Sequence, residues 1–460
     1  MRTICRLLLL FGFLATPVGC MVPSRPSLSA LHHDLAPVER VQHRPQLDFA
    51  PHCEPDAPAS LQEMIAIALK HHPDLRAAQA RIEAARGRMI QSGLAPNPMF
   101  GPDFGELADR DNQLGEAGAR LTATIVPRWK RKLAEFAGAA EVQAADWQAV
   151  TRSFDVITRV RLAYFELLTA QRERETLDGI VNVSLEARKA VQSLEKAGVA
   201  VRPDVLRANV ELEQNQLKRE ISQRRVEAAR QNLLTALGRP PIALDQIKPD
   251  PHDFNQAPPF YHWNAMLECL RDNSSELQEA RSLIVQTERM LTKVKADVSP
   301  NYALLYRPFY ASSQGNVHSE IVVQATIPIF DRNQGNIRAA EADIVRASAF
   351  EKQLELMLTE KLTNAYQRYQ AARKQVETYT ESIVPEARES LRLIEAGYKA
   401  RDKKYDYTAV LQAQQVLFQA ELALTQVRGE LWRSISEIAG ILQQEDLLNG
   451  CATSEPPRLP

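Results

Sequence analysis

The sequence of 460 residues predicts a mainly α-helical protein with a small β part, built from two similar halves. Three observations predict this class: long stretches rich in Ala, Glu, Gln, Arg and Leu, short segments that alternate apolar and polar residues, and an internal repeat. Shifting the chain by about 202 residues aligns Leu75 with Leu277 and Gly238 with Gly440. Each half is therefore expected to read helix, strand, strand, long helix, helix.

Composition excludes several classes of protein. The chain has 56 Lys and Arg against 57 Asp and Glu, a net charge of -1, which argues against a nucleic-acid binder driven by global charge. After the N-terminus no apolar run reaches the roughly 18 residues of a membrane helix, and the mean hydropathy is -0.31. A polytopic helical membrane protein is excluded. A membrane β-barrel stays open, because its alternating strands hardly register on hydropathy.

Residues 1–20 are expected to be a signal peptide of the lipoprotein type. Arg2 and Arg6 supply the positive end, and Leu7 to Ala15 form the apolar stretch. A small residue directly before Cys20 resembles a bacterial lipoprotein signal, so we expect Cys20 to carry the lipid. The alternative is ordinary signal cleavage without lipidation.

The remaining cysteines are Cys5, Cys53, Cys269 and Cys451, and no pair has the spacing of a zinc or redox motif. A Cys53–Cys451 disulfide could form in an exported protein, but sequence alone does not determine the pairing.

Proline-rich segments set the expected boundaries of the chain. They define an extended lead-in at 21–59, a first repeat at 60–239, a connector at 240–262, a second repeat at 263–445 and a tail at 446–460.

The first repeat opens with a helical pattern that follows Ser60, an N-cap with Glu63 three residues later, and runs to about Gly93. Strands are expected at 99–104 and 121–125, because the second of these segments alternates at period 2.

The helices that follow are long. We expect one over 129–197 and a shorter return helix over 203–238. In the second repeat the corresponding segments are strands at 302–306 and 323–327 and a helix over 331–396. At 1.5 Å per residue each long helix would measure roughly 100 Å.

The final helix carries apolar residues seven apart over four heptads, which predicts a coiled-coil seam. The two rows of this seam are Val410, Leu417, Leu424, Leu431 and Ile438, and Ala413, Ala420, Val427, Ser434 and Ile441.

The strands suggest a shared barrel. Two strand pairs cannot close a barrel in lipid, but three copies would supply twelve strands, an even number in the known range. The residues expected to face the lumen are Thr122, Thr124, Gln324 and Thr326, and those expected to face lipid are Leu121, Ala123, Ile125, Val323, Ala325 and Ile327. The alternative is a small soluble sheet on a periplasmic scaffold.

The sequence resembles the TolC-like outer-membrane factors of tripartite efflux pumps over nearly all of residues 60–445. The resemblance lies in Ala68-Leu-Lys-His-His-Pro-Asp-Leu75, Gly93-Leu-Ala-Pro-Asn-Pro98, Asp204-Val-Leu-Arg-Ala208 and Ile327-Pro-Ile-Phe-Asp-Arg-Asn-Gln-Gly-Asn-Ile337. It implies a homotrimer with a twelve-stranded barrel in the outer membrane and a periplasmic helical tunnel. It also implies two partners, a periplasmic adaptor and an inner-membrane transporter of the resistance–nodulation–division type.

The segment Phe330 to Asn336 is most similar to the cobalt–zinc–cadmium branch of that family. It implies passive export of heavy-metal cations, with drug efflux and type I secretion as alternatives. A lipid-anchored periplasmic coiled-coil scaffold is the alternative of another class.

Two turns are expected to form the periplasmic tips. Gly198 and Gly397 can end a helix with positive φ, and Asp204 and Asp406 suit the start of the returning helix. The resemblance implies that these residues, with Arg401, contact the adaptor. Asp406 and Gln412 are candidates for a lumen constriction.

No residue pattern indicates catalysis, a cofactor or a metal site. His71 and His72 point about 100° apart on a helix and rarely share one ion. We therefore expect a protein that is not an enzyme.

Overall fold

The computed structural model describes residues 60–105, 115–198, 200–238, 249–312, 314–400, 405, 407–448 and 453–454. The signal, the lead-in, Cys20, Cys53, Cys451, Arg401 and Asp406 lie outside the described residues, so their expected roles remain predictions.

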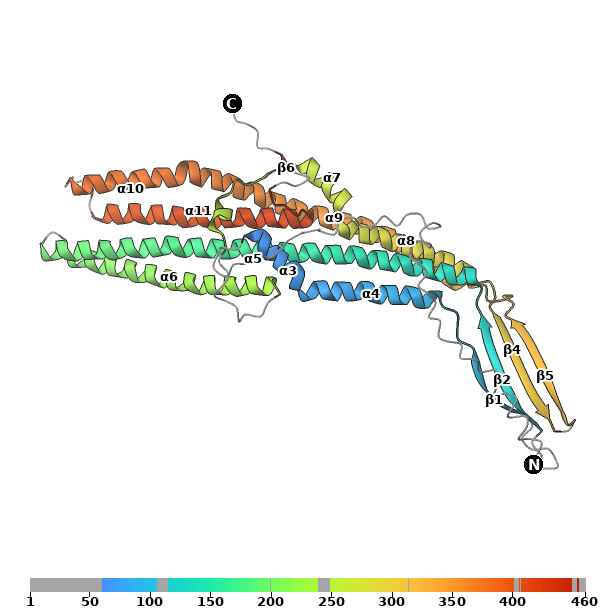
Figure 1. The fold of residues 1–460 in the computed structure, drawn as a ribbon. Helices are drawn as coiled ribbons and strands as arrows, with labels where there is room; N and C mark the ends of the chain where they lie inside the picture. The colour runs from blue at the N-terminus through green and yellow to red at the C-terminus, as the bar shows by residue number, and fades with distance from the viewer. Residues whose placement is uncertain are drawn as a thin grey trace, which may run out of the picture. The chain divides into compact units, whose positions relative to one another are not determined.

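The same order of elements occurs twice along the chain (Figure 1). The first half contains α3 (Leu61–His71), α4 (Pro73–Gly93), β1 (Met99–Gly105), β2 (Glu116–Ile125), α5 (Arg128–Lys196) and α6 (Arg202–Ala236). The second half contains α7 (Trp263–Asn273), α8 (Ser275–Ala296), β4 (Tyr302–Ala311), β5 (Asn316–Ala325), α9 (Gln334–Thr378), the π turn η3 (Tyr379–Ile383), α10 (Val384–Lys399) and α11 (Tyr407–Ile441). Between the halves lie the 3₁₀ helix η2 (Pro251–Asn255) and β3 (Phe260–Tyr261), which pairs with β6 (Thr453–Ser454).

A capping residue divides the first helical segment of each half. His72 ends α3 and caps α4, its Nδ1 accepting from the Asp74 amide at 3.1 Å. Ser274 takes the same place between α7 and α8, and its hydroxyl accepts from the Leu277 amide. The prediction of one unbroken helix over 60–93 is therefore wrong. Pro73 follows the cap because it fits the first helical turn but not a helix interior.

The two long helices differ from each other. α5 runs unbroken for 69 residues, as the sequence predicts within one residue at each end. Its counterpart is interrupted at η3, and Pro385 lies in the first turn of α10. Proline lacks the N–H that would continue the α-helical bonding, so the expected continuous helix over 331–396 is wrong.

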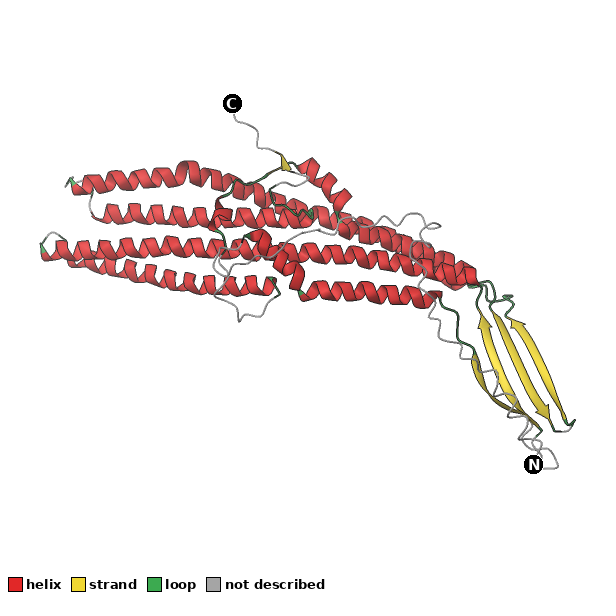
Figure 2. Ribbon diagram, viewed as in Figure 1, coloured by secondary structure: helices red, strands yellow, loops and turns green. Residues whose placement is uncertain are grey.

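The four strands form one antiparallel sheet in the order β1-β2-β4-β5 (Figure 2). β1 and β5 are its edge strands. The register pairs Thr122 with Leu305 and Ile125 with Tyr302. Because side chains alternate, Thr122 and Thr124 lie on one face, and Leu121, Ala123 and Ile125 lie on the other.

β5 follows the same rule, with Gln324 on the face of Thr122 and with Val323 and Ala325 on the opposite face. The strand ends at Ala325, so the prediction that Thr326 and Ile327 belong to it is wrong. Pro328 has no N–H to continue a ladder, which limits strand pairing at this point.

The helical core is built around α5. Tyr164 and Leu167 have no exposed surface, and the Phe165 ring stacks on the Trp432 ring of α11 at 4.8 Å. The predicted seam of α11 is mostly buried: Val410, Ala413, Leu417, Ala420, Leu431, Ser434 and Ile438 are all buried. The heptad prediction is confirmed for these positions.

A buried arginine fastens the segment after α11 to α5. Arg161 is 1% exposed, and its guanidinium donates to the carbonyl oxygens of Gln444, at 2.9 Å, and Glu445. Burial lowers the pKa of Arg161 to about 10, so it stays charged at neutral pH.

Arg161→Met should lower the free energy of unfolding by about 2 kcal/mol, because two carbonyls lose a charged donor. The measurement is thermal or urea unfolding, with hydrogen exchange at residues 442–448. Arg172→Met is the matched control, since Arg172 forms an exposed pair with Glu175. Its effect should stay below about 0.5 kcal/mol. Equal losses in the two variants would contradict the anchoring role.

Candidate functional site

One face of the sheet carries a cluster of charged side chains. The guanidinium of Arg307 on β4 pairs with Asp103, with Glu116, and with Glu320 at 3.6 Å. Arg120 also pairs with Asp103, at 2.8 Å. The register places these residues on the same face as Thr122 and Gln324. Sequence reasoning missed the cluster, although an arginine inside the apolar strand of Tyr302 to Ala311 was a usable signal.

The opposite face is apolar over all four strands. Its exposed members are Phe100, Phe104, Leu121, Ile125, Tyr302, Tyr306, Tyr310, Val317, Ile321 and Val323. A contiguous apolar face of this kind marks a contact with lipid or with another protein.

The turn between α5 and α6 matches its prediction in part. Gly198 has φ of 72°, the left-handed conformation that glycine adopts without cost. Asp204 is not the N-cap of α6. Val201 holds that position, and the Asp204 carboxylate accepts from the Val201 amide at 3.4 Å.

The second turn differs from its prediction. Gly397 does not end a helix, because α10 continues to Lys399 and is capped by Ala400. A side chain at position 397 would overlap the ring of Tyr405, so the glycine permits close approach of the chain after the turn. The start of α10 packs on α11 through a buried cluster of Val384, Ala387, Leu417 and Ala420.

Near these turns α6 and α11 line a cleft of about 450 Å³. Gln412 is one of its lining residues, together with Leu206 and Val210. The Gln415 amide donates to Glu211 at 3.2 Å across the two helices. Gln412 is exposed, and it lies where the helical hairpin α5–α6 meets the hairpin α10–α11.

The segment Phe330 to Asn336 forms the turn that starts α9. Asn333 has φ of 59°, and its side-chain Nδ2 donates to the Val294 carbonyl of α8 at 2.8 Å. The Asp331 carboxylate accepts from the Asn333 backbone, and Asn336 donates to the Asn333 side chain. This segment leads from β5 into α9, and the Asn333 hydrogen bond holds it against α8.

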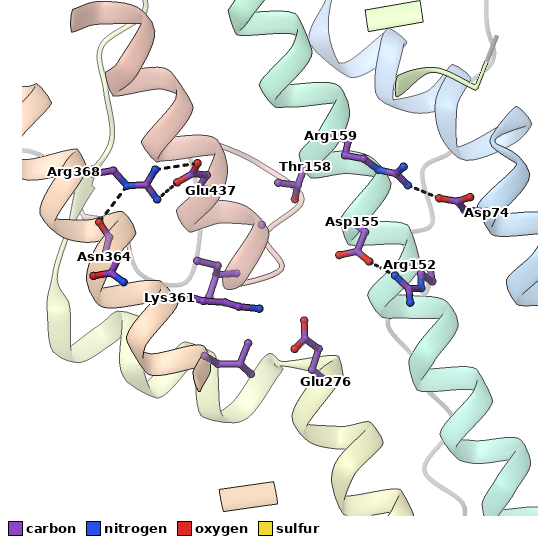
Figure 3. Close-up of a pocket in the computed structure, with 13 residues that line it drawn as sticks. Asp74, Arg152, Asp155, Thr158, Arg159, Glu276, Lys361, Asn364, Arg368 and Glu437 are labelled. Atoms are coloured by element: carbon purple, nitrogen blue, oxygen red, sulfur yellow. Dashed lines mark hydrogen bonds and ion pairs between the residues drawn. The ribbon is translucent and has the colours of Figure 1, made fainter. Parts of the chain in front are cut away.

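A charged cavity of about 670 Å³ lies among α4, α5, α8, α9 and α11 (Figure 3). Three ion pairs line it: Arg159 with Asp74 at 2.5 Å, Arg152 with Asp155 at 2.9 Å, and Arg368 with Glu437.

Glu276 and Lys361 also line the cavity, and within the described ranges neither forms an ion pair. Burial raises the pKa of Glu276, and the positive charge of Lys361 opposes that rise. Burial likewise raises the pKa of Glu279, one turn further along α8. Sequence reasoning missed this cavity, because its residues come from five separate helices.

His72 and Cys269 stabilise the fold rather than form a binding site. His72 is buried and accepts a hydrogen bond through Nδ1, and burial lowers its pKa, which favours the neutral ring that this bond needs. Cys269 on α7 is disulfide-bonded. Across the parts of the chain that the structure describes, no group of three His, Cys, Asp or Glu residues could hold a metal ion. No helix in those parts is long and apolar enough to cross a membrane.

Glu276→Gln should raise the melting temperature near neutral pH, because it removes a half-buried charge that has no ion-pair partner in the described ranges. Because the pKa of Glu276 is raised in the folded protein, the protonated carboxyl stabilises the fold below the unfolded pKa of about 4.5. This stabilisation is lost in the wild type as the pH rises and the carboxyl ionises. The gain should therefore shrink as the pH falls toward about 4. Melting curves across this pH range test it, with Glu175→Gln as the exposed control. A gain that is independent of pH would contradict this assignment.

A family model described as outer membrane efflux protein matches residues 64–239 and 272–442. The cobalt-zinc-cadmium resistance protein CzcC of Cupriavidus metallidurans is 22% identical over 391 residues, which cover 85% of this chain and 91% of CzcC.

Two solved structures share the fold. CusC gives a TM-score of 0.70 at 16% identity, over 86% of this chain and 95% of CusC. The outer-membrane channel OprN gives 0.68 at 20% identity, over 83% of this chain and 89% of OprN. These relatives are channel proteins rather than enzymes. The family model matches both halves of the chain, in agreement with the duplicated helices and the sheet. This chain therefore belongs to the outer membrane efflux protein family.

Proposed function

We propose that this protein is the outer-membrane channel of a tripartite efflux system that exports heavy-metal cations without chemical conversion. The observation that carries the proposal is the sheet, which has one apolar face, one polar and charged face, and two unpaired edges. Unpaired edges are costly in lipid, because no water satisfies the backbone groups there.

Three copies would remove these edges by pairing β1 of one copy with β5 of the next. The resulting twelve-stranded barrel would direct Thr122, Thr124 and Gln324 to the lumen. The apolar residues Leu121, Ala123, Ile125, Val323 and Ala325 would then face lipid. Thr326 and Ile327 follow the strand and would lie at the rim of the barrel.

The long helices would continue the wall of the barrel as a periplasmic tunnel. The turns with Gly198, Asp204, Gly397, Arg401 and Asp406 would form its tips and meet a periplasmic adaptor. Asp406 and Gln412, repeated three times, would narrow the lumen there. An inner-membrane transporter of the resistance–nodulation–division type would supply the substrate, and Cys20 would carry a lipid anchor.

The assignment of metal cations as substrate is supported by the similarity to CzcC, which is named for cobalt, zinc and cadmium resistance. The segment Phe330 to Asn336 adds support, since its resemblance is to the same branch.

Ile321→Arg, near the middle of β5, should reduce the amount of trimer in the outer membrane, since a charge on the lipid face costs roughly 2–4 kcal/mol at mid-membrane. Val322→Arg is the matched control, because this adjacent residue lies on the opposite face of β5. The readout is the heat-modifiable trimer in membrane fractions. Equal yields of the two variants, or extraction of the wild type without detergent, would favour the soluble scaffold.

Deletion of the gene should sensitise the bacterium to cobalt, zinc and cadmium, because export would lose its outlet. Growth inhibition is measured for metals, antibiotics and dyes, with the intact gene returned as control. Unchanged metal tolerance would remove the metal assignment. Sensitivity to organic compounds alone would favour drug efflux, and loss of a secreted protein would favour type I secretion.

A further inference from the structure

The two connections that lead from the sheet into helices expose large apolar side chains. Trp129 follows β2 and is 48% exposed, while Ile327 and Phe330 follow β5 and are 75% and 90% exposed. Single exposed apolar residues are common on proteins, but a group at one place marks a contact surface.

The topology brings these connections together. The register pairs Ile125 with Tyr302, and Tyr302 with Ala325. The last residues of β2 and β5 therefore lie at the same end of the sheet, with the first residue of β4 between them. With strands about 4.8 Å apart, the two exits are roughly 10 Å from each other. Tyr302, which is 44% exposed, lies between them and continues the apolar face of the sheet.

Both exits are held by specific contacts. Lys130 donates to the Ser299 carbonyl, and to the Asn301 side chain at 3.2 Å, which fixes the start of α5 against the loop before β4. That loop, Ile327 and Phe330 line one cleft of about 820 Å³. Ile327 and Phe330 are therefore exposed at a defined cleft, and Lys130 holds the start of the helix that carries Trp129 beside it.

Three exposed cations flank the two rings, while Asp297, Asp331 and Asp343 line the cleft beside Phe330. Arg128 and Lys132 lie on either side of Trp129 and are exposed, and Arg332 follows two residues after Phe330. Within the described residues none of these three cations forms an ion pair with a carboxylate. Arg332 uses its Nε to donate to the Ile329 carbonyl, and the nearby Asp331 carboxylate accepts from the Asn333 amide.

We propose that Arg128, Trp129, Lys132, Ile327, Phe330 and Arg332 form a rim patch that binds anionic phospholipid. The apolar side chains would enter the boundary between acyl chains and headgroups, and the cations would contact phosphate. The patch rests on the proposed function, since it requires the sheet to lie in a membrane. Within the described residues its three cations have no carboxylate partner, which favours the phosphate of a lipid headgroup over an apolar protein surface.

Fluorescence quenching of Trp129 tests the rim patch. The purified trimer is reconstituted into phosphatidylcholine vesicles, with or without phosphatidylglycerol, whose acyl chains carry bromine. The signal is the difference between wild type and Trp129→Phe, because three other tryptophans remain. We expect lipid quenching of Trp129 that strengthens with phosphatidylglycerol.

A second reporter, Leu121→Trp on a Trp129→Phe background, lies on the apolar face of β2 and reports whether the sheet enters the bilayer. If neither reporter is quenched, the proposed channel fails. If Leu121→Trp is quenched and Trp129 is not, the rim patch alone is overturned. Protection of Trp129 from both lipid and aqueous iodide would assign the surface to a neighbouring copy instead.

The charge component is tested by the double variant Arg128→Gln with Lys132→Gln. The preference for phosphatidylglycerol over phosphatidylcholine should fall roughly tenfold to thirtyfold, about fivefold per cation. The matched control is Arg346→Gln with Lys374→Gln, two exposed cations of α9. An unchanged preference in the first pair, or an equal fall in both pairs, would contradict headgroup binding.

Discussion

The packing of side chains on the unbroken helix α5 is the interaction on which the other elements depend. α3, α4, α6, α8 and α11 all contact this helix, and η2 meets it through the hydrogen bond from Tyr164 to Asp253 at 2.6 Å. An isolated helix draws little stability from its own hydrogen bonds, so the buried stripe of α5 must be covered along its length. The helices α3, α4 and α6 of the first half and α8 and α11 of the second together supply that cover.

The sheet obeys a different constraint. Among the described strands the backbone pairing runs from β1 to β5, while the side chains separate sharply into an apolar face and a charged face. One arginine, Arg307, pairs with acids from three strands on the charged face. A soluble sheet would bury the apolar face against its own helices; here the exposed rings of Phe100 and Tyr306 remain for an outside partner.

Local signals in the sequence predicted much of the fold. The capping box at Ser60, the positive φ of Gly198 and the heptads of α11 depend on neighbouring residues, and all three occur in the structure. What sequence reasoning missed depends on distant contacts. Gly397 resembles a helix end, yet its role is set by Tyr405, and the charged cavity exists only where five helices meet.

The π turn η3 explains why the second half departs from the first. Before it, the buried residues of α9 recur at Leu362, Ala365, Tyr369 and Ala372; continued at the same spacing, this series would reach positions 383 and 386. The buried residues are instead Val384 and Ala387, each one place later. A π turn holds one residue more than an α turn, so it absorbs this extra residue and returns the helix to register with α11. The apolar stripe of the helix thereby faces α11 on both sides of the turn.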